Sequence, residues 1–397
     1  MKNRYKVLIL ANNFGFGVIA PIQSLMLCAH GCSLQTIGLA FGAYAVMVIT
    51  AEIPSGICAD MRGRKKSYLL SCAISLISCI ILILSKSFLA AAAGLMLFGL
   101  ATAFASGSID ALIVEETIAE RGQSSLSKTV SSISAYQCAG IASGALLGGY
   151  LPNSSGYMIH LIIRMTVAAV VGAVAFIILN EIPVEKYKQK ATIRMHLGKM
   201  LNQFQTSHSF VCIVLCITVI AAMQVLLETY WQPRLTTLNE NLTQTYLGYI
   251  CAGGYVATTA GCFLMGRVKP GDGRRRWAAY LGIGFGLCVL IFLLSFQTKT
   301  MWFAFIYTAI YLAIGLISVP EQTIVNTETS DDVRASMLSV VSFAARLGGM
   351  LSSIASSALL LRMDISTVWL LSALVTMACV TVVAVMRIIA YKRQLQS

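Results

Sequence analysis

The chain is too apolar for a water-soluble protein. Of its 397 residues, 57% are hydrophobic and only 11% are charged. The formal net charge of +13 could indicate a nucleic-acid partner, but the cations lie in short loops between apolar segments, where they set the orientation of membrane spans. The composition therefore predicts a polytopic membrane protein and excludes a nucleic-acid-binding one.

Twelve apolar segments are long enough to cross a bilayer, since a helix of about 20 residues spans ~30 Å of hydrocarbon. The runs are continuous rather than alternating, which excludes a β-barrel. The first segment is too long for a signal peptide and lacks a cleavage site, so we treat it as a span. We predict spanning helices at residues 5–28, 34–58, 67–85, 88–112, 129–151, 157–180, 208–233, 243–266, 276–296, 300–325, 335–361 and 366–389.

The distribution of cations predicts the topology. With the N-terminus inside, the inner loops and tails hold 23 Lys and Arg residues, the outer loops hold four, and two are embedded in spans. Short basic loops are retained on the cytoplasmic side of a membrane. We therefore expect a multi-pass protein of the bacterial cytoplasmic (inner) membrane, with both termini in the cytoplasm.

The loop between the second and third predicted spans carries the most informative motif. Its glycines, its carboxylate and its cations follow a fixed spacing: Gly56, Asp60, Arg62, Gly63, Arg64 and Lys65. This spacing resembles the loop signature of the major facilitator superfamily, which lies between its second and third helices. A solvated basic loop would explain the cations but neither the two glycines nor Asp60. The signature is widely shared, so it indicates a family and no substrate.

The chain also repeats itself once. The sequence Asp110-Ala-Leu-Ile-Val114 matches Glu321-Gln-Thr-Ile-Val325 at an offset of 211 residues. A second match, at an offset of 208, pairs Ser131, Ser134 and Gly140 with Ser339, Ser342 and Gly348.

These matches predict two six-helix halves, at 1–180 and 208–397, joined by a cytoplasmic linker at 181–207. The resemblance to the major facilitator fold then covers the whole chain. It implies an all-α membrane protein of twelve helices, with a substrate cavity between the two halves near the bilayer midplane.

The fifth predicted span carries a stripe of glycines at a spacing of four, namely Gly140, Gly144 and Gly148, followed by Gly149. It resembles a glycine-rich signature that is associated with the antiporters of this superfamily, except that Ala145 stands where the signature has proline. The resemblance favours efflux. The alternative is generic close packing, because a stripe without side chains lets another helix approach.

The fourth predicted span departs from the pattern of the proton-coupled drug exporters. Those proteins commonly carry an arginine four residues before a glycine, and here Leu95 holds that position before Gly99. The sequence therefore lacks that arginine.

Ionisable groups inside spans are costly, about 2.5–3.5 kcal/mol at mid-helix, and are therefore functional candidates. Arg346 should lie about 18 Å from the inner end of its helix, so it must face a cavity or pair with an acid. Glu52 is the partner that we expect, although it could instead bind a proton. Glu228 lies beside aromatics that suit an amphipathic ligand or form an interfacial belt. The candidates for contact with substrate or proton are Glu52, Glu228, Tyr230, Trp231 and Arg346.

Three acids near the inner ends of predicted spans are expected to act in gating. Asp110 and Glu321 occupy matching positions in the repeat, and acids at these positions in the family hold the basic loop and the opposite half together. Asp60 fits the same role through the N-terminus of the eleventh helix, whose dipole favours a carboxylate. Arg164, in the outer half of the sixth span, is expected to extend toward the outer interface.

The sequence shows no constellation typical of an enzyme or a metal site. The four histidines have no metal-like spacing, so we expect no metal, no other cofactor and no enzymatic activity. The twelve cysteines lie mostly in apolar runs and are expected to be small core residues. Cys28 and Cys32 flank an outer loop, and a disulfide between them is the alternative.

We therefore predict a monomeric secondary transporter in the lipid bilayer that resembles the drug–proton antiporters of the superfamily. It is expected to export small amphipathic compounds, drugs included, with the proton as coupling ion. An importer of a small polar or anionic nutrient, with Arg346 as counter-ion, is the alternative among transporters. A membrane sensor that no longer transports is the alternative of another class.

Overall fold

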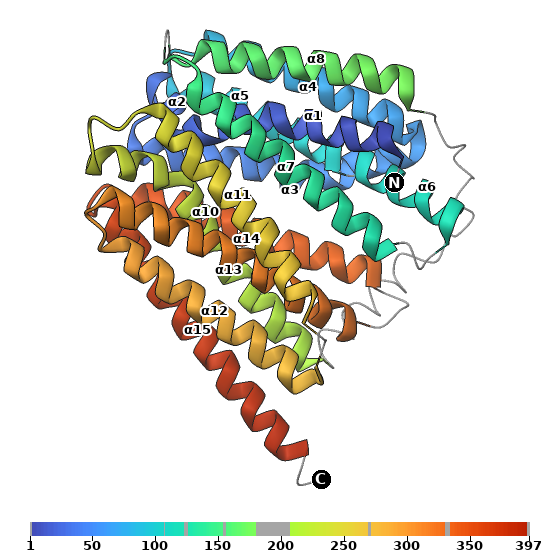
Figure 1. Ribbon diagram of the computed structural model, residues 1–397, viewed down its shortest axis with the longest axis vertical. Coiled ribbons are helices and arrows are strands. Elements are labelled where there is room, and N and C mark those ends of the chain that lie inside the picture. Colours follow the sequence, from blue (N-terminus) through green and yellow to red (C-terminus); the bar gives the residue numbers. More distant parts are fainter. Residues whose placement is uncertain are drawn as a thin grey trace. The chain divides into compact units, whose positions relative to one another are not determined.

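Helices account for all of the regular structure in the described part of the chain (Figure 1). The computed structural model describes residues 2–106, 108–122, 126–153, 156–179, 207–268, 271–329 and 334–394. The first half contains α1 (Asn3–Ile19), η1 (Ala20–Ile22), α2 (Gln23–Ala29), α3 (Leu34–Arg62), α4 (Arg64–Leu84), α5 (Phe88–Ser106), α6 (Ile109–Arg121), α7 (Leu126–Tyr150) and α8 (Met158–Ile178). The second half contains α10 (His208–Leu238), α11 (Gln244–Gly266), α12 (Gly273–Ser295), α13 (Thr300–Thr327), α14 (Arg334–Leu359) and α15 (Ile365–Gln394).

Twelve described segments are long and apolar enough to span a membrane, which confirms the predicted fold class. Each coincides with a predicted span to within five residues at either end. The largest difference is at α10, which we expected to end at Pro233 and which continues to Leu238. Proline is tolerated inside membrane helices because neighbouring groups satisfy the backbone carbonyl that it leaves free.

Two spans are not single helices. The first is divided into α1, η1 and α2, and Pro21 is the middle residue of the short 3-10 helix η1. The fourth is divided into α5 and α6. Continuous apolar runs gave no sign of either break, since a hydrophobic pattern reports length and not helix continuity.

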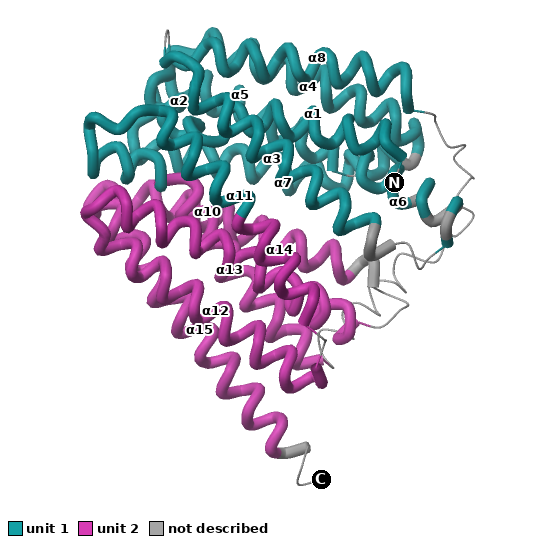
Figure 2. The backbone as a smooth tube through the Cα atoms, viewed as in Figure 1, with its two compact units in different colours: residues 1–187, 231–256 teal, residues 188–230, 257–397 magenta. Residues whose placement is uncertain are grey.

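The chain divides into two compact units, shown in two colours in Figure 2. Unit 1 contains Met1–Tyr187 and Trp231–Val256, and unit 2 contains Lys188–Tyr230 and Ala257–Ser397. The units therefore differ from the predicted halves over residues 231–256. The predicted linker at 181–207 lies outside the described residues, except for Ser207.

Within unit 1, α1 packs against α7 and α8, while α4 packs against α5 and α8. One end of this bundle is closed by a buried apolar cluster that joins α1, α4, α6 and α8. Tyr68 of α4 and Ile113 of α6 are among its most buried members. The cluster fixes the first residues of α1 beside α6, which determines the position of the charged groups described below.

The same helix packing recurs in the two units. In unit 1, a Cβ at Gly140 would lie 2.5 Å from the Leu10 carbonyl oxygen, and in unit 2 a Cβ at Gly348 would lie 2.3 Å from the Thr218 carbonyl oxygen. Gly348 follows Gly140 by 208 residues, and Thr218 follows Leu10 by the same 208 residues. The repeat in the sequence therefore corresponds to a repeated contact between helices, which supports an internal duplication.

The cysteines form no disulfide, and all twelve are free thiols. The alternative of a Cys28–Cys32 disulfide is therefore wrong. Burial raises the pKa of the Cys32 thiol to about 11, so this thiol stays protonated and unreactive at neutral pH.

Candidate functional site

The loop motif forms the turn between α3 and α4. Gly63 has φ 96° and ψ 144°, a backbone conformation that residues with a Cβ rarely adopt. Its backbone N–H donates to the Ala59 carbonyl at 3.0 Å and so ends α3. The sequence therefore needs glycine here for a backbone reason.

The other members of the motif lie around this turn. Arg62 is exposed and Arg64 is half-buried, and the Lys65 ammonium lies 5.1 Å from the centroid of the Phe176 ring on α8. A Cβ at Gly56 would meet no described atom within 4 Å. The backbone of Asp60 belongs to α3, but its side chain lies outside the described part of the chain, so its gating role stays a prediction.

The two repeated acids have polar neighbours within their own units. Asp110 lies in the first turn of α6 and accepts a hydrogen bond from the Gln137 amide at 3.3 Å. Glu321 lies on α13, and its carboxylate interacts electrostatically with the Tyr280 hydroxyl on α12. Their predicted gating role is untested by these contacts, because each contact lies within one unit.

The glycine stripe of α7 receives the backbone of α1. A Cβ at Gly144 would lie 2.2 Å from the Phe14 carbonyl oxygen, and a Cβ at Gly148 would lie 2.2 Å from the Val18 carbonyl oxygen. Real Cβ atoms essentially never approach this closely. Any side chain on this face would therefore separate the two helices.

Gly149 lies on another face of α7. A Cβ added at Gly149 would lie 2.8 Å from the Cα of Gly248 on α11. The neighbouring rings of Tyr150 and Tyr249 meet edge to face, with centroids 5.9 Å apart. Their hydroxyls hydrogen-bond each other. The end of α7 thus contacts α11 closely, at the end of both helices that we predict to be extracellular.

Polar side chains tie residues 231–256 to the first half within unit 1. The Gln232 side-chain oxygen accepts from the Ser24 backbone N–H at 2.9 Å, and its amide nitrogen donates to the Ala20 carbonyl at 2.7 Å. Gln232 is buried. These bonds connect this segment to α2 and η1 within unit 1.

Gln244, the first residue of α11, makes a second such connection. Its amide nitrogen donates to the carbonyls of Gly148 at 2.7 Å and Leu151 at 3.1 Å, and lies 2.8 Å from His160 Nε2. His160 is fully buried. Sequence reasoning assigned no role to either residue, and the signal available was a glutamine at the boundary of an apolar run.

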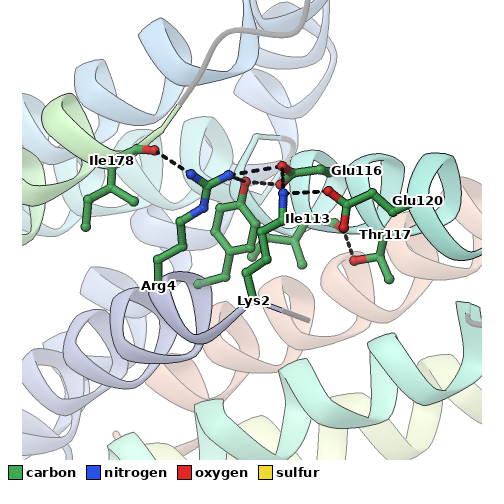
Figure 3. Close-up of polar contacts among 8 residues, drawn as sticks. Lys2, Arg4, Ile113, Glu116, Thr117, Glu120 and Ile178 are labelled. Atoms are coloured by element: carbon green, nitrogen blue, oxygen red, sulfur yellow. Dashed lines mark hydrogen bonds and ion pairs between the residues drawn. The ribbon is translucent and has the colours of Figure 1, made fainter.

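A charged cluster at the predicted cytoplasmic side was also missed (Figure 3). The Lys2 ammonium lies 2.6 Å from the Glu116 carboxylate and 2.5 Å from Glu120, and the Arg4 guanidinium lies 3.0 Å from Glu116. The Tyr5 hydroxyl donates to the other oxygen of Glu116. We had interpreted the N-terminal cations only as topology signals.

The cluster changes the ionisation of its members. Hydrogen bonds to Glu116 and Glu120 raise the pKa of Lys2. Burial alone would raise the pKa of Glu116, but the hydrogen bonds from Lys2 and Tyr5 outweigh it, so the pKa of Glu116 is lowered. Both groups therefore stay charged at neutral pH and hold the start of α1 against α6.

In unit 2, Glu228 is the accessible member of the predicted aromatic group. Its side chain is exposed although it lies within a membrane span, and its carboxylate accepts a hydrogen bond from the Tyr311 hydroxyl at 2.9 Å. Tyr230 and Trp231 are buried, and the Tyr230 hydroxyl is 2.9 Å from that of Ser356. Neither aromatic belongs to an exposed interfacial belt in this structure.

Glu52 and Arg346 lie in different units. Each side chain is half-buried, Glu52 on α3 and Arg346 on α14. Arg346 lies within the span Met337–Leu359, so it is embedded as the sequence indicated. Their pairing stays a prediction.

A family model for the Major Facilitator Superfamily matches residues 7–353. The chain belongs to this superfamily. The matched range begins in α1 and ends in α14, so it contains the loop motif, the glycine stripe and every embedded candidate. Lys2, Arg4 and Tyr5 precede it, which is why the superfamily pattern gave no hint of the charged cluster.

Three proteins similar to this chain share only 14–22% of its residues. An uncharacterized MFS-type transporter of Methanocaldococcus jannaschii is 22% identical over 242 residues, and the match covers 60% of each protein. Among solved structures, a variant of the nucleoside transporter NupG has a TM-score of 0.81 and 15% identity, covering 96% of this chain and 98% of that one. A bacterial homolog of the human lysosomal transporter Spinster has a TM-score of 0.73 and 14% identity, covering 99% and 96%. These structures share the superfamily fold with this chain.

Proposed function

We propose that this protein is a secondary active transporter that exports small amphipathic organic molecules in exchange for protons, by alternating access. We place it in a bacterial cytoplasmic membrane, as a monomer with both termini in the cytoplasm. The superfamily membership and the repeated helix packing support the transport mechanism. The excess of cations in the predicted inner loops supports the orientation.

The observation that carries this proposal is Glu228, an acid whose residue is exposed although it lies within a membrane span. Glu228 lies ten residues before the end of α10 at Leu238, about 15 Å from that end of the helix, and within the predicted span 208–233. A carboxylate at that depth is too costly to face lipid, so it must line a water-filled cavity. There it can bind a proton or the cationic group of a substrate, and either event would neutralise it.

Tyr311 supports the same interpretation. Its hydroxyl holds one oxygen of Glu228, and its ring packs against Tyr307 with centroids 4.7 Å apart. Both tyrosines are buried, so the carboxylate is oriented by a rigid neighbour. Within the described part of the chain no hydrogen bond to its second oxygen is seen, so we assign that oxygen to the ligand.

Transport by inverted vesicles tests this proposal. A panel of cationic dyes, neutral drugs and nucleosides would be added with and without a pH gradient that is acid inside. We expect gradient-dependent uptake of amphipathic compounds by the parent, at least tenfold slower uptake by Glu228→Gln, and a smaller loss in Tyr311→Phe. Glu240→Gln, an exposed acid of a predicted outer loop, is the matched control and should behave as the parent.

Uptake of a polar nutrient into the cell is the second candidate. The similarity in fold to the nucleoside transporter NupG favours it, and Arg346 could serve as counter-ion for an anionic nutrient. Accumulation of nucleosides or small anions by right-side-out vesicles, without export of any amphipathic compound, would replace our proposal with this one. A sensor would bind a compound of the panel and move none.

A further inference from the structure

His30 lies in the turn between α2 and α3, with both ring nitrogens against backbone carbonyls. Its Nδ1 atom is 2.9 Å from the Ser85 carbonyl oxygen, and its Nε2 atom is 2.9 Å from the Gly156 carbonyl oxygen. The side chain is buried. Ser85 ends α4 and Gly156 lies just before α8. One imidazole ring therefore joins three turns, at the end of unit 1 that we predict to be extracellular.

The two contacts of His30 require two protons on its ring. A carbonyl oxygen can only accept a hydrogen bond, so each contact needs an N–H group on the imidazole. A neutral imidazole carries one N–H group and an imidazolium carries two. In the neutral form, one ring nitrogen would turn its lone pair toward a carbonyl oxygen. The geometry therefore fits the imidazolium, and histidine gains and loses this second proton between about pH 5 and 8.

No carboxylate forms an ion pair with His30 among the residues that the structure describes. The only charged residue in the sequence of the three turns is Lys86, which is exposed. The first turns of α3 and α5 contain no titratable residue. The other titratable groups of this region are Cys28, Cys32, Tyr157 and His160. The two carbonyl oxygens are therefore the groups that compensate an imidazolium here, so a change in its charge acts directly on the turns.

The turn before α8 is strained at the point where His30 contacts it. Gly156 and Tyr157 both have φ 66°, and Tyr157 is the one residue other than glycine with a positive φ in the described part of the chain. This conformation is unfavourable for a residue with a Cβ and persists only where surrounding contacts hold it. The hydrogen bond from His30 to the Gly156 carbonyl is such a contact.

We propose that His30 is a proton-dependent clamp on the outer turns of unit 1. With two ring protons it holds both the Ser85 and the Gly156 carbonyl. With one proton it keeps the buried bond to Ser85 and releases Gly156, because that contact is only partly buried and water can replace the donor there. The turn before α8 then relaxes. The clamp lies in unit 1, whereas Glu228 lies in unit 2, and it does not depend on the direction of transport.

Hydrogen exchange of the purified full-length protein in detergent tests the clamp, at about pH 5.5 and about pH 7.5, on either side of the ordinary histidine pKa. The reporters for α8 are the backbone N–H groups of His160 and Leu161, which donate to the Tyr157 carbonyl. The reporter for α5 is the N–H of Ala91, which donates to the Ser87 carbonyl. Protection factors remove the intrinsic effect of pH on exchange. They should be about fivefold lower at the higher pH for the α8 reporters and unchanged for Ala91.

Two variants identify the group responsible. His30→Gln keeps a hydrogen-bond donor but cannot gain a charge, so its α8 reporters should show the same low protection at both pH values. His208→Gln, which removes an exposed histidine at the start of α10, is the matched control and should respond as the parent. If His30→Gln does not fold, the contrast between the two sets of reporters in the parent decides the matter. Equal protection of the α8 reporters at both pH values in the parent would overturn the proposal. A pH response that persists in His30→Gln would also overturn it and would assign the response to His160.

Discussion

Gly63 shows at the scale of a single residue how the loop motif is built. Its positive φ of 96° ends α3, and α4 begins at the next residue with Arg64. The sequence alone indicated that the glycines of this loop have a role of their own, because a solvated basic loop does not require glycine. It could not predict where the side chain of Arg64 or Lys65 would lie, because such contacts depend on the neighbouring α8.

The first prediction concerns this turn. Gly63→Leu forces a side chain into a conformation that costs about 1–3 kcal/mol, and Asp60→Asn removes the proposed gating charge. We expect both variants to insert into the membrane in normal amounts and to lose transport. Membrane yield and vesicle transport, measured in parallel, check this. Normal transport rates in either variant would refute the gating role of the loop.

The second prediction uses the charged cluster at the start of α1. Because the pKa of Glu116 is lowered from about 4.3 in an unfolded chain, its ion pairs stabilise the fold above that pH and are lost as pH falls through the lower folded value. Lys2 acts in the opposite sense. Because its pKa is raised, its contribution to stability is fully present up to about pH 10.4 and is lost only as the pH rises further. Glu116→Gln should therefore melt lower than the parent at pH 7 and lose less stability on acidification.

Melting temperatures from pH 3.5 to 8 give this measurement. Glu120→Gln is the matched control, because Glu120 contacts the cluster only through Lys2 among the ion pairs described and is more exposed than Glu116. It should change the melting temperature by a smaller amount. Parallel pH curves for the parent and Glu116→Gln would contradict the role given to this carboxylate.

The third prediction concerns Arg346 and its expected partner Glu52. If the two side chains pair, Arg346→Ala leaves a half-buried acid uncompensated and lowers stability, by less than the roughly 3–5 kcal/mol of a fully buried pair, and replacing Glu52 with Gln as well restores part of it. If Arg346 faces a cavity, the single variant keeps its stability and changes substrate preference. Stability and transport of the two single variants and the double variant distinguish these cases. If Arg346→Ala changed neither stability nor transport, both interpretations would be wrong.

At the scale of elements, the glycine stripe of α7 is where packing is tightest against α1. The sequence predicted that some helix would approach this face, since glycines at a spacing of four present no side chains. It could not identify α1, whose glycines and apolar residues have no periodic signature. The breaks within the first and fourth spans were likewise invisible, because the apolar run continues through Pro21 and through the end of α5.

The fourth prediction is that one methyl group on this stripe is enough to disturb the bundle. Gly144→Ala places a Cβ 2.2 Å from the Phe14 carbonyl oxygen, and overpacking of this kind costs about 1–3 kcal/mol. Gly282→Ala on α12 is the matched control, because its Cβ meets no described atom within 4 Å. We expect a lower melting temperature and reduced transport in Gly144→Ala only. If the two variants melt alike, the close contact between α1 and α7 is absent from the protein in solution.

At the scale of the whole molecule, the repeat in the sequence predicted two halves, and the recurrence of one helix contact at the same spacing of 208 residues agrees with it. The compact units differ from those halves over residues 231–256, where Gln232 and Gln244 bond to the first half of the chain within unit 1. Such bonds depend on how helices that are distant in the sequence pack together, and no pattern in the sequence predicts them. The same holds for Arg164 of α8, which we expected to extend toward the outer interface. Its guanidinium instead lies 4.2 Å from the ring of Phe98 on α5 and 5.6 Å from that of Phe16 on α1, and these helices are far apart in the sequence.

The central claim is that export is coupled to protons through Glu228, and proton movement in liposomes tests it most directly. Purified protein would be reconstituted with a pH-sensitive dye inside, and the best compound from the transport panel would be added outside without an imposed gradient. We predict that entry of the compound drives protons outward, that a protonophore abolishes the resulting pH change inside, and that Glu228→Gln moves no protons while Glu240→Gln does. Entry of compound and protons in the same direction, or equal proton movement in Glu228→Gln and the parent, would contradict the account.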